Sequence, residues 1–286
     1  MTTLHSLAPV SPAAHVRCRL IVHADDFGET EEITKGICQA IEAGAVTSTS
    51  IMANMPGTEA ALPRVAALGE RASFGVHLNF CEGRPLTPGR SLVDERGELH
   101  PKRVLFLRAL KGQLSPQELE AEITAQIARI HEAGVRISHV DGHKHLHQLP
   151  IVRNAVARVL PRFGIERVRV TRLRHLDAAR KPATLVREAL AWQADRTFRR
   201  ARLRSPSRVV DLQAIMRPAP AGRGASLARS GSEGPIEVFC HPGTQRADIE
   251  KPGSCARFEE LTFLLSPRFQ DLLSANHARM VSYWDV

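Results

Sequence analysis

The chain has 286 residues, of which 43% are hydrophobic and 24% charged, a composition that excludes disorder along the whole length and indicates a globular protein. Its formal net charge of +9 leaves nucleic acid, an anionic membrane surface or an acidic substrate open as partners. With one tyrosine and two tryptophans, the chain offers little for nucleic-acid bases to stack on, so we expect no nucleic-acid partner.

Residues 1–16 have neither a basic start nor an apolar run of membrane length, and no such run follows them. This pattern predicts a flexible extension with no signal peptide and no transmembrane segment, and therefore a cytoplasmic protein. The five cysteines are widely spaced without a C-x-x-C pair, which favours reduced, packed thiols over a disulfide framework or a zinc knuckle.

The first half of the chain alternates between strand-like and helix-like patterns. Apolar or β-branched runs predict strands at 19–24, 47–53 and 73–79. Helices are predicted between them at 29–43, where isoleucines recur every four residues, and at 58–68.

The same alternation continues in the second half. A helix is predicted at 116–133, with Ser115 as its N-cap and a glycine after its end. Further elements are a strand at 136–141, a helix at 151–162 and strands at 167–171, 236–240 and 279–283. This order predicts an α/β fold of the (β/α)-barrel type, in which catalytic groups lie at the carboxyl ends of the strands.

We expect a single domain over 17–286, with an insertion at about 172–235. The insertion contains an arginine-rich run at 196–208 and a Gly/Ser/Pro-rich stretch at 218–235. An arginine run of this kind is typical of a solvated helix face or loop, while a site for a polyanion remains the alternative.

Two adjacent carboxylates, Asp25 and Asp26, follow the first predicted strand. Neighbouring residues of an extended chain point to opposite sides, so both can face one site only if the chain turns there, and Gly28 permits a turn. The alternative is that one aspartate caps the helix that follows.

The segment Asp141–His147, DGHKHLH, is the strongest local motif. If the segment is extended, its alternate residues Asp141, His143, His145 and His147 share one side. Imidazole and carboxylate groups suit zinc and similar ions, so the motif predicts a metal site in which only some of the histidines are ligands.

Two single histidines also follow predicted strands. His77 ends the strand at 73–79, and His241 follows the strand at 236–240 in the sequence HPG. Each alone is consistent with an ordinary strand-end residue. Together with the aspartate pair and the histidine cluster, they place polar groups at four separate strand ends, which favours one shared site.

The motifs ADDFG (24–28), GVHLN (75–79), DGHKHLH (141–147) and HPG (241–243) resemble, in this order, those of the YdjC family of carbohydrate deacetylases, which includes chitooligosaccharide and hopanoid-biosynthesis-associated deacetylases. The resemblance implies a distorted (β/α) barrel, similar to a TIM barrel. It also implies hydrolytic, metal-dependent removal of an acetyl group from an N-acetylated sugar. The region 172–235 carries no motif of the family.

The resemblance implies a role for each matching residue. Asp26, His77 and one histidine of the cluster, for which we choose His143, would bind one divalent ion: zinc or magnesium, with cobalt and nickel as alternatives. Asp25 would be the general base and His241 the general acid. The remaining polar residues of the cluster would contact the ligands or the substrate: Asp141, His145 and His147.

The sequence is also compatible with two other functions. Histidines and aspartates on a barrel also serve metal-dependent phosphoesterases, which would be favoured by two bridged metals. A non-catalytic sugar-binding protein is the second alternative, but it would not need Asp25. The acceptor sugar and the oligomeric state are left open, a homodimer included.

Overall fold

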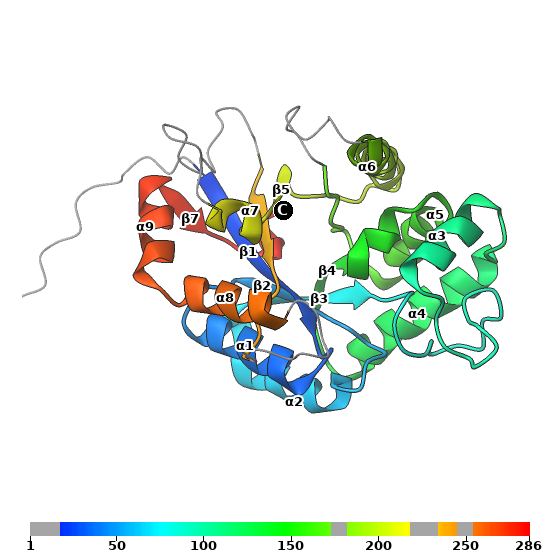
Figure 1. Cartoon of the computed structure of the whole chain (residues 1–286), viewed down its shortest axis with the longest axis horizontal. Coiled ribbons are helices and arrows are strands. Elements are labelled where there is room, and N and C mark those ends of the chain that lie inside the picture. The colour runs from blue at the N-terminus through cyan, green and yellow to red at the C-terminus, as the bar shows by residue number, and fades with distance from the viewer. Residues whose placement is uncertain (1–17, 173–181, 218–233, 245–253) are drawn as a thin grey trace, which may run out of the picture.

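The computed structural model describes residues 18–172, 182–217, 234–244 and 254–286 (Figure 1). A parallel sheet crosses the centre of the molecule, in the order β4-β3-β2-β1-β6-β5, and β7 pairs with β1. The strands are β1 (Cys18–Phe27), β2 (Ser48–Ile51), β3 (Ser73–Leu78), β4 (Ile137–Gly142), β5 (Arg208–Asp211), β6 (Ile236–Cys240) and β7 (Ala278–Met280). The predicted α/β fold is confirmed.

The sheet as described is not closed, but single parallel bridges extend it beyond β4. Val140 of β4 bridges to Val168, and Arg167 bridges to Arg204, four residues before β5 begins. Residues 167–171, predicted as a strand, therefore form only isolated bridges. This arrangement agrees with a distorted barrel, in which a strand between β4 and β5 is reduced to a few hydrogen bonds.

Helices surround the sheet (Figure 1). They are α1 (Glu31–Glu42), α2 (Thr58–Leu68), α3 (Lys102–Leu110), α4 (Pro116–Glu132), α5 (Pro150–Val159), α6 (Pro182–Arg200), α7 (Leu212–Met216), α8 (Ser254–Leu264) and α9 (Pro267–Ala275), with 3-10 turns at Gly69–Arg71, His143–Gln148, Leu160–Phe163 and Tyr283–Asp285. One continuous hydrophobic cluster joins the strands to the inner faces of these helices.

The predicted helices before residue 164 agree with the structure to within a few residues, because their apolar residues recur with the period of a helix. Ser115 caps α4 as predicted, accepting a hydrogen bond from the backbone N–H of Glu118. Several elements were not predicted: α3, α6, β5, α7, α8 and α9. Three of them, α6, β5 and α7, lie in the expected insertion, and β5 makes part of that stretch a strand of the sheet.

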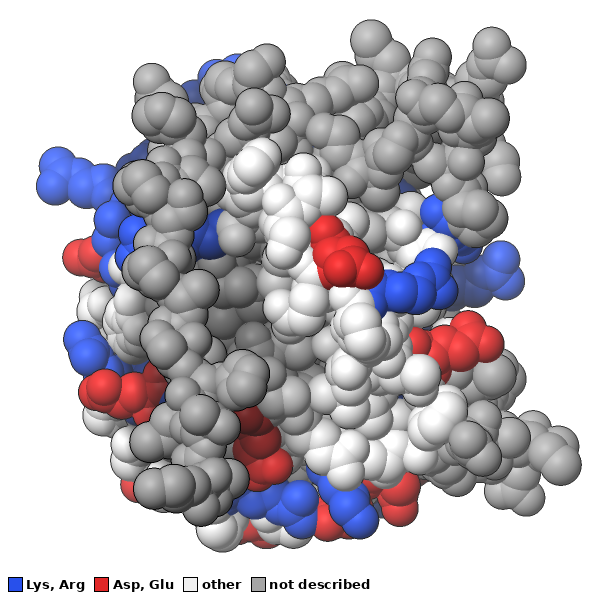
Figure 2. Space-filling model, turned by 90° about the vertical axis from the view of Figure 1, so that its left-hand side faces the viewer, with Lys and Arg blue, Asp and Glu red and all other residues white. Residues whose placement is uncertain are grey.

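Among the described side chains on the face shown in Figure 2, acidic and basic groups lie interspersed. In the arginine-rich run, Arg199 pairs with Asp195 of its own helix and Arg204 pairs with Glu166, both at exposed positions. Cys18, Cys38, Cys81 and Cys240 are free and buried. In the described part of the chain, no helix has the length and apolar character needed to span a bilayer.

Candidate active site

The end of β1 directs both aspartates toward one cavity. The register between β1 and β2 shifts between Ala24 and Phe27, and Asp26 has a left-handed backbone with φ of 72°. This irregularity breaks the strict alternation of the strand, so neighbouring side chains can share one site. Neither aspartate is the N-cap of α1, because Thr30 accepts the hydrogen bond from Ile33 N–H.

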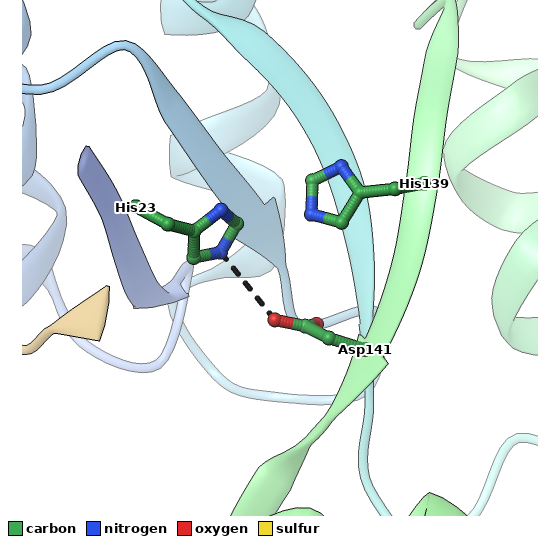
Figure 3. A group of neighbouring side chains, drawn as sticks. All are labelled: His23, His139 and Asp141. Carbon is green, nitrogen blue, oxygen red and sulfur yellow. Dashed lines mark ion pairs between the residues drawn. The ribbon is translucent and has the colours of Figure 1, made fainter. Parts of the chain in front are cut away.

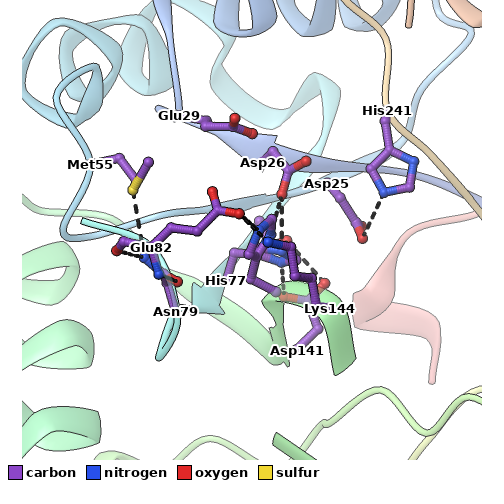
Figure 4. A network of polar contacts seen from close by, with 12 residues as sticks. Asp25, Asp26, Glu29, Met55, His77, Asn79, Glu82, Asp141, Lys144 and His241 are labelled. Carbon is purple, nitrogen blue, oxygen red and sulfur yellow. Dashed lines mark hydrogen bonds and ion pairs between the residues drawn. The ribbon is translucent and has the colours of Figure 1, made fainter. Parts of the chain in front are cut away.

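Asp26, His77 and His143 come together from the ends of three strands. Figure 4 shows Asp26 and His77 of this group. Oδ1 of Asp26 lies 3.1 Å from Nε2 of His77 and 3.0 Å from Nδ1 of His143. Burial alone would raise the pKa of Asp26, but hydrogen bonds from both histidines outweigh it and hold that pKa well below its usual range. The donor atoms of this group lie within 4.8 Å of one another, close enough to hold one metal ion.

A carboxylate behind His77 fixes the orientation of its ring. Nδ1 of His77 lies 2.8 Å from Oδ1 of Asp141, which leaves Nε2 directed toward Asp26. A histidine held in this way by a carboxylate is the usual arrangement in metal sites, where it sets the tautomer and raises the basicity of the ligand. Both the donor set and this support fit a divalent ion.

The histidine cluster is not extended, so the predicted alternation fails beyond Gly142. His143 begins a 3-10 turn that runs to Gln148, and Lys144 and His145 within it have left-handed backbones. The turn separates the three rings. His143 meets Asp26, His145 lines the cavity beside Phe239, and His147 points back to the backbone carbonyl of Arg169 at 2.9 Å.

Asp25 is held by Arg169, a residue the motifs do not include. The guanidinium donates to both carboxylate oxygens, Nη2 to Oδ1 at 2.7 Å and Nη1 to Oδ2 at 2.9 Å, and Nη1 is also 2.9 Å from Oδ2 of Asp141. Burial alone would raise the pKa of Asp25, but Arg169 outweighs it, so the pKa is lowered and Asp25 is ionised.

His241 lies on the other side of Asp25, after β6 (Figure 4). Its Nε2 is 3.7 Å from Oδ2 of Asp25, and its backbone N–H donates to the buried carboxylate of Glu260. Asp25 therefore lies between an arginine below and a partly exposed histidine above.

These groups open into a cavity of about 510 Å³. Polar groups of the site form its floor, and helices α3 and α6 contribute to its walls. The lining residues are Asp25, Asp26, His77, Lys102, Phe106, His143, Lys144, His145, Leu146, Gln148, Leu149, Thr171, Arg187, Leu190, Asp211, Phe239, His241 and Arg257. A space of this size and mixed lining suits a small polar ligand such as a sugar.

Sequence reasoning missed two arginines of the site. Arg257 donates to Oδ2 of Asp26 at 2.6 Å and to Glu29 at 3.1 Å. Arg169 is fully buried and also donates to Glu237 at 2.7 Å. For Arg169 there was a signal, since it lies between two valines in a strand-like run, where an arginine must find buried anionic partners.

A second group of donors lies beneath the cavity, formed by His23, His139 and Asp141 (Figure 3). Its geometry is that of a supporting layer. Both ring nitrogens of His23 already contact serines, Ser48 at 2.9 Å and Ser50 at 3.1 Å. His139 stacks on Tyr283 with 3.6 Å between ring centroids, and burial lowers its pKa well below the usual value, so it is neutral.

The fold and the positions of the motifs agree with the family model described as YdjC-like protein, which matches residues 19–275. The chain belongs to the YdjC-like family. The mouse (Mus musculus) member named carbohydrate deacetylase is 31% identical, over 96% of this chain and 96% of its own. A Vibrio cholerae protein of the same name is 29% identical, over 93% of this chain and 95% of its own.

The YdjC-like fold is also seen in a crystal structure of a protein from Enterococcus faecalis V583. It superposes with a TM-score of 0.71 at 21% sequence identity, covering 93% of this chain and 98% of the other. The likeness supports the fold. The family resemblance that the sequence motifs indicated is thus confirmed over most of the chain.

Proposed function

We propose that the protein is a metal-dependent hydrolase that removes the acetyl group from an N-acetylated sugar, such as an N-acetylglucosamine oligosaccharide or glycoconjugate. One observation carries the proposal. Asp26, His77 and His143 form a set of three donors, and the neighbouring carboxylate of Asp25 is anchored separately, by Arg169. The names of the relatives, carbohydrate deacetylase, support the same activity.

Asp26, His77 and His143 would hold one divalent ion, zinc or magnesium, with cobalt and nickel as alternatives. Such an ion supplies Lewis acidity, which activates water and polarises the acetyl carbonyl. The other groups of the cluster have supporting roles in this proposal. Asp141 orients His77, His147 is bound to the backbone at Arg169, and His145 faces the substrate across the cavity.

Asp25 would take the proton of the attacking water. Its carboxylate is ionised, and each oxygen that accepts from Arg169 retains a second lone pair for this purpose. His241 would give a proton to the amide nitrogen as the C–N bond breaks, because its ring is partly exposed at the mouth of the cavity. The products are acetate and the free sugar amine.

A phosphoesterase with two bridged metals is less compatible with these contacts. The carboxylates of Asp25 and Asp141 both accept hydrogen bonds from Arg169, and Asp141 also bonds His77 and Ser50. A second ion at these carboxylates would lie beside the buried positive charge of Arg169, which they already balance. A purely sugar-binding protein would leave the anchoring of Asp25 without a purpose.

The test is acetate release from a panel of free, lipid-linked and nucleotide-linked N-acetyl sugars, using protein stripped with a chelator and reloaded with zinc, magnesium, cobalt or nickel. Asp25→Asn should lower turnover by about 10²-fold or more, the usual contribution of a general base, while metal content stays at the parent's level. Turnover at the parent's rate would contradict the assignment of Asp25.

Metal content of single variants tests the ligand set with matched controls inside the cluster. His143→Ala should lose the ion, whereas His145→Ala and His147→Ala should retain it, because only His143 contacts Asp26. Loss of the ion only in His145→Ala or His147→Ala would overturn the choice of His143.

A further inference from the structure

Helix α3 exposes an unusual apolar surface. Only Leu105 of its nine residues is buried, although the helix contains three leucines, a valine and a phenylalanine. Leu107 is 54% and Leu110 is 63% exposed, and Val104 is exposed as well. Apolar residues grouped in this way on a surface mark a contact with another molecule or a membrane.

The same surface is strongly basic. The segment 102–111 contains four basic side chains, Lys102, Arg103, Arg108 and Lys111, and no acidic one. Successive helix residues turn by about 100°, so the outward arc opposite Leu105 carries Leu110, Arg103, Leu107, Lys111 and Val104 in turn. Leucines and cations therefore alternate across one face.

Helix α6, which lines the same cavity as α3, also exposes apolar and basic side chains. Its Leu185 is 56% exposed, Val186 is also exposed, and Arg187 follows them. Phe106 and Lys102 of α3 line the same cavity as Arg187 and Leu190 of α6, so the two helices are walls of one opening. Both lie on the side of the molecule away from α8 and α9 (Figure 1).

We infer that this surface, defined as Val104, Leu107 and Leu110 of α3 with Leu185 and Val186 of α6 and the basic residues around them, binds the surface of an anionic lipid bilayer. Helices that rest on membranes combine exposed leucines, which enter the headgroup region, with lysines and arginines, which contact lipid phosphates. Bound in this way, two helices that line the cavity rest on the lipid headgroups.

A second copy of the chain fits this surface less well. In a two-fold dimer the same patch meets itself, so the basic residues of one α3 would face those of the other with no acidic residue on either helix. An anionic bilayer matches both properties of the surface, its charge and its exposed leucines. The inference does not depend on the proposed chemistry.

The test is flotation of the whole protein with phosphatidylcholine vesicles, either pure or containing one quarter phosphatidylglycerol. The parent should float with the anionic vesicles, less so in high salt, and bind pure phosphatidylcholine weakly. Leu107→Gln with Leu110→Gln should reduce the bound fraction about tenfold or more, since two leucine side chains no longer leave water.

Two matched controls separate this surface from general effects. The first control is Leu265→Gln, at a residue that is 46% exposed and lies between α8 and α9. This variant should bind the vesicles like the parent. For charge, Arg103→Glu with Lys111→Glu should abolish flotation, whereas Lys35→Glu with Arg71→Glu, two exposed cations elsewhere, should weaken it only slightly. Thermal midpoints of all variants check folding.

Failure of the parent to float with anionic vesicles would overturn the inference, as would equal binding by the leucine variant and its control. A dimer that the leucine variant abolishes, without vesicle binding by the parent, would assign the surface to a second copy instead. Acetate release plays no part in these measurements, so their failure leaves the proposed function untouched.

Discussion

At the scale of single residues, the site depends on buried charges that compensate one another. Arg169 is a partner of Asp25, Asp141 and Glu237 alike, and these carboxylates raise its pKa well above the ordinary value despite its burial. Breaking such a group costs several kcal/mol, because the remaining charges are left in the interior without a counter-ion. The arginine therefore stabilises the fold and orients Asp25.

His147 makes the stability of the protein depend on pH. Burial is the main cause that lowers its pKa from 6.5 to about 4, so the unfolded chain takes up a proton before the folded one does. The free energy of unfolding is therefore unaffected by protonation of this histidine above pH 6.5 and falls as the pH drops toward 4. The fall is about 1.4 kcal/mol per pH unit, or about 3 kcal/mol in all.

We therefore expect His147→Gln, which keeps a donor for the carbonyl of Arg169, to unfold with a flatter pH dependence than the parent. Urea unfolding between pH 7.5 and 4.5, with a chelator present, measures the difference. His131→Gln, at an exposed histidine of α4, is the control and should keep the parent's slope. Equal slopes for the parent and His147→Gln would contradict the prediction.

At the scale of elements, the turn that carries His241 is positioned by close packing against α1. A Cβ atom added at Gly36 of α1 would lie 2.6 Å from the backbone of Gly243, two residues after His241. The obstructing atoms are backbone, so the turn itself would have to move. The backbone N–H of Thr244 also donates to the carbonyl of Glu32, which ties the turn to the same helix.

If His241 is the general acid as proposed, Gly36→Ala should shift its turn and lower acetate release about tenfold or more, since an ångström of misplacement at a catalytic group has large effects. Lys35→Ala, an exposed neighbour on the same helix, controls for the change in helix propensity and should keep the parent's rate. Parent-like activity of Gly36→Ala would show that the turn tolerates the displacement.

At the scale of the whole molecule, the C-terminal segment supports the site from below the sheet. The hydroxyl of Tyr283 donates to Glu237 at 2.6 Å, its backbone N–H donates to Ser73 at the start of β3, and its ring stacks on His139. Burial and the adjacent Glu237 raise the pKa of Tyr283 well above its usual value, so it remains a donor. The end of the chain is thus joined to Arg169 and Asp25 through Glu237.

Tyr283→Phe should lower the free energy of unfolding by about 1–3 kcal/mol, because Glu237 loses a hydrogen-bond donor in a buried site. Ser282→Ala is the control. Its hydroxyl caps the exposed C-terminal turn, so the loss should be smaller. Denaturant unfolding of both variants measures this, and a larger loss in Ser282→Ala than in Tyr283→Phe would contradict the supporting role.

Local sequence patterns were sufficient for the strand ends and their motifs. A run of buried residues ending in ADDFG or GVHLN shows where a parallel strand stops, and parallel strands bring such ends to one edge of the sheet. This reasoning brought Asp25, Asp26, His77 and His241 to one region, and helical periodicity located most helices before residue 164.

Only the tertiary structure decided the contacts that span the chain. Arg169 is 144 positions from Asp25 in the sequence, and Arg257 is 231 positions from Asp26. No local sequence pattern carries information over such separations. The left-handed turn at Lys144 and His145 separated the clustered histidines, which an extended reading had placed together. The exposed face of α3 was equally invisible, because a sequence shows that residues are apolar but not whether other elements cover them.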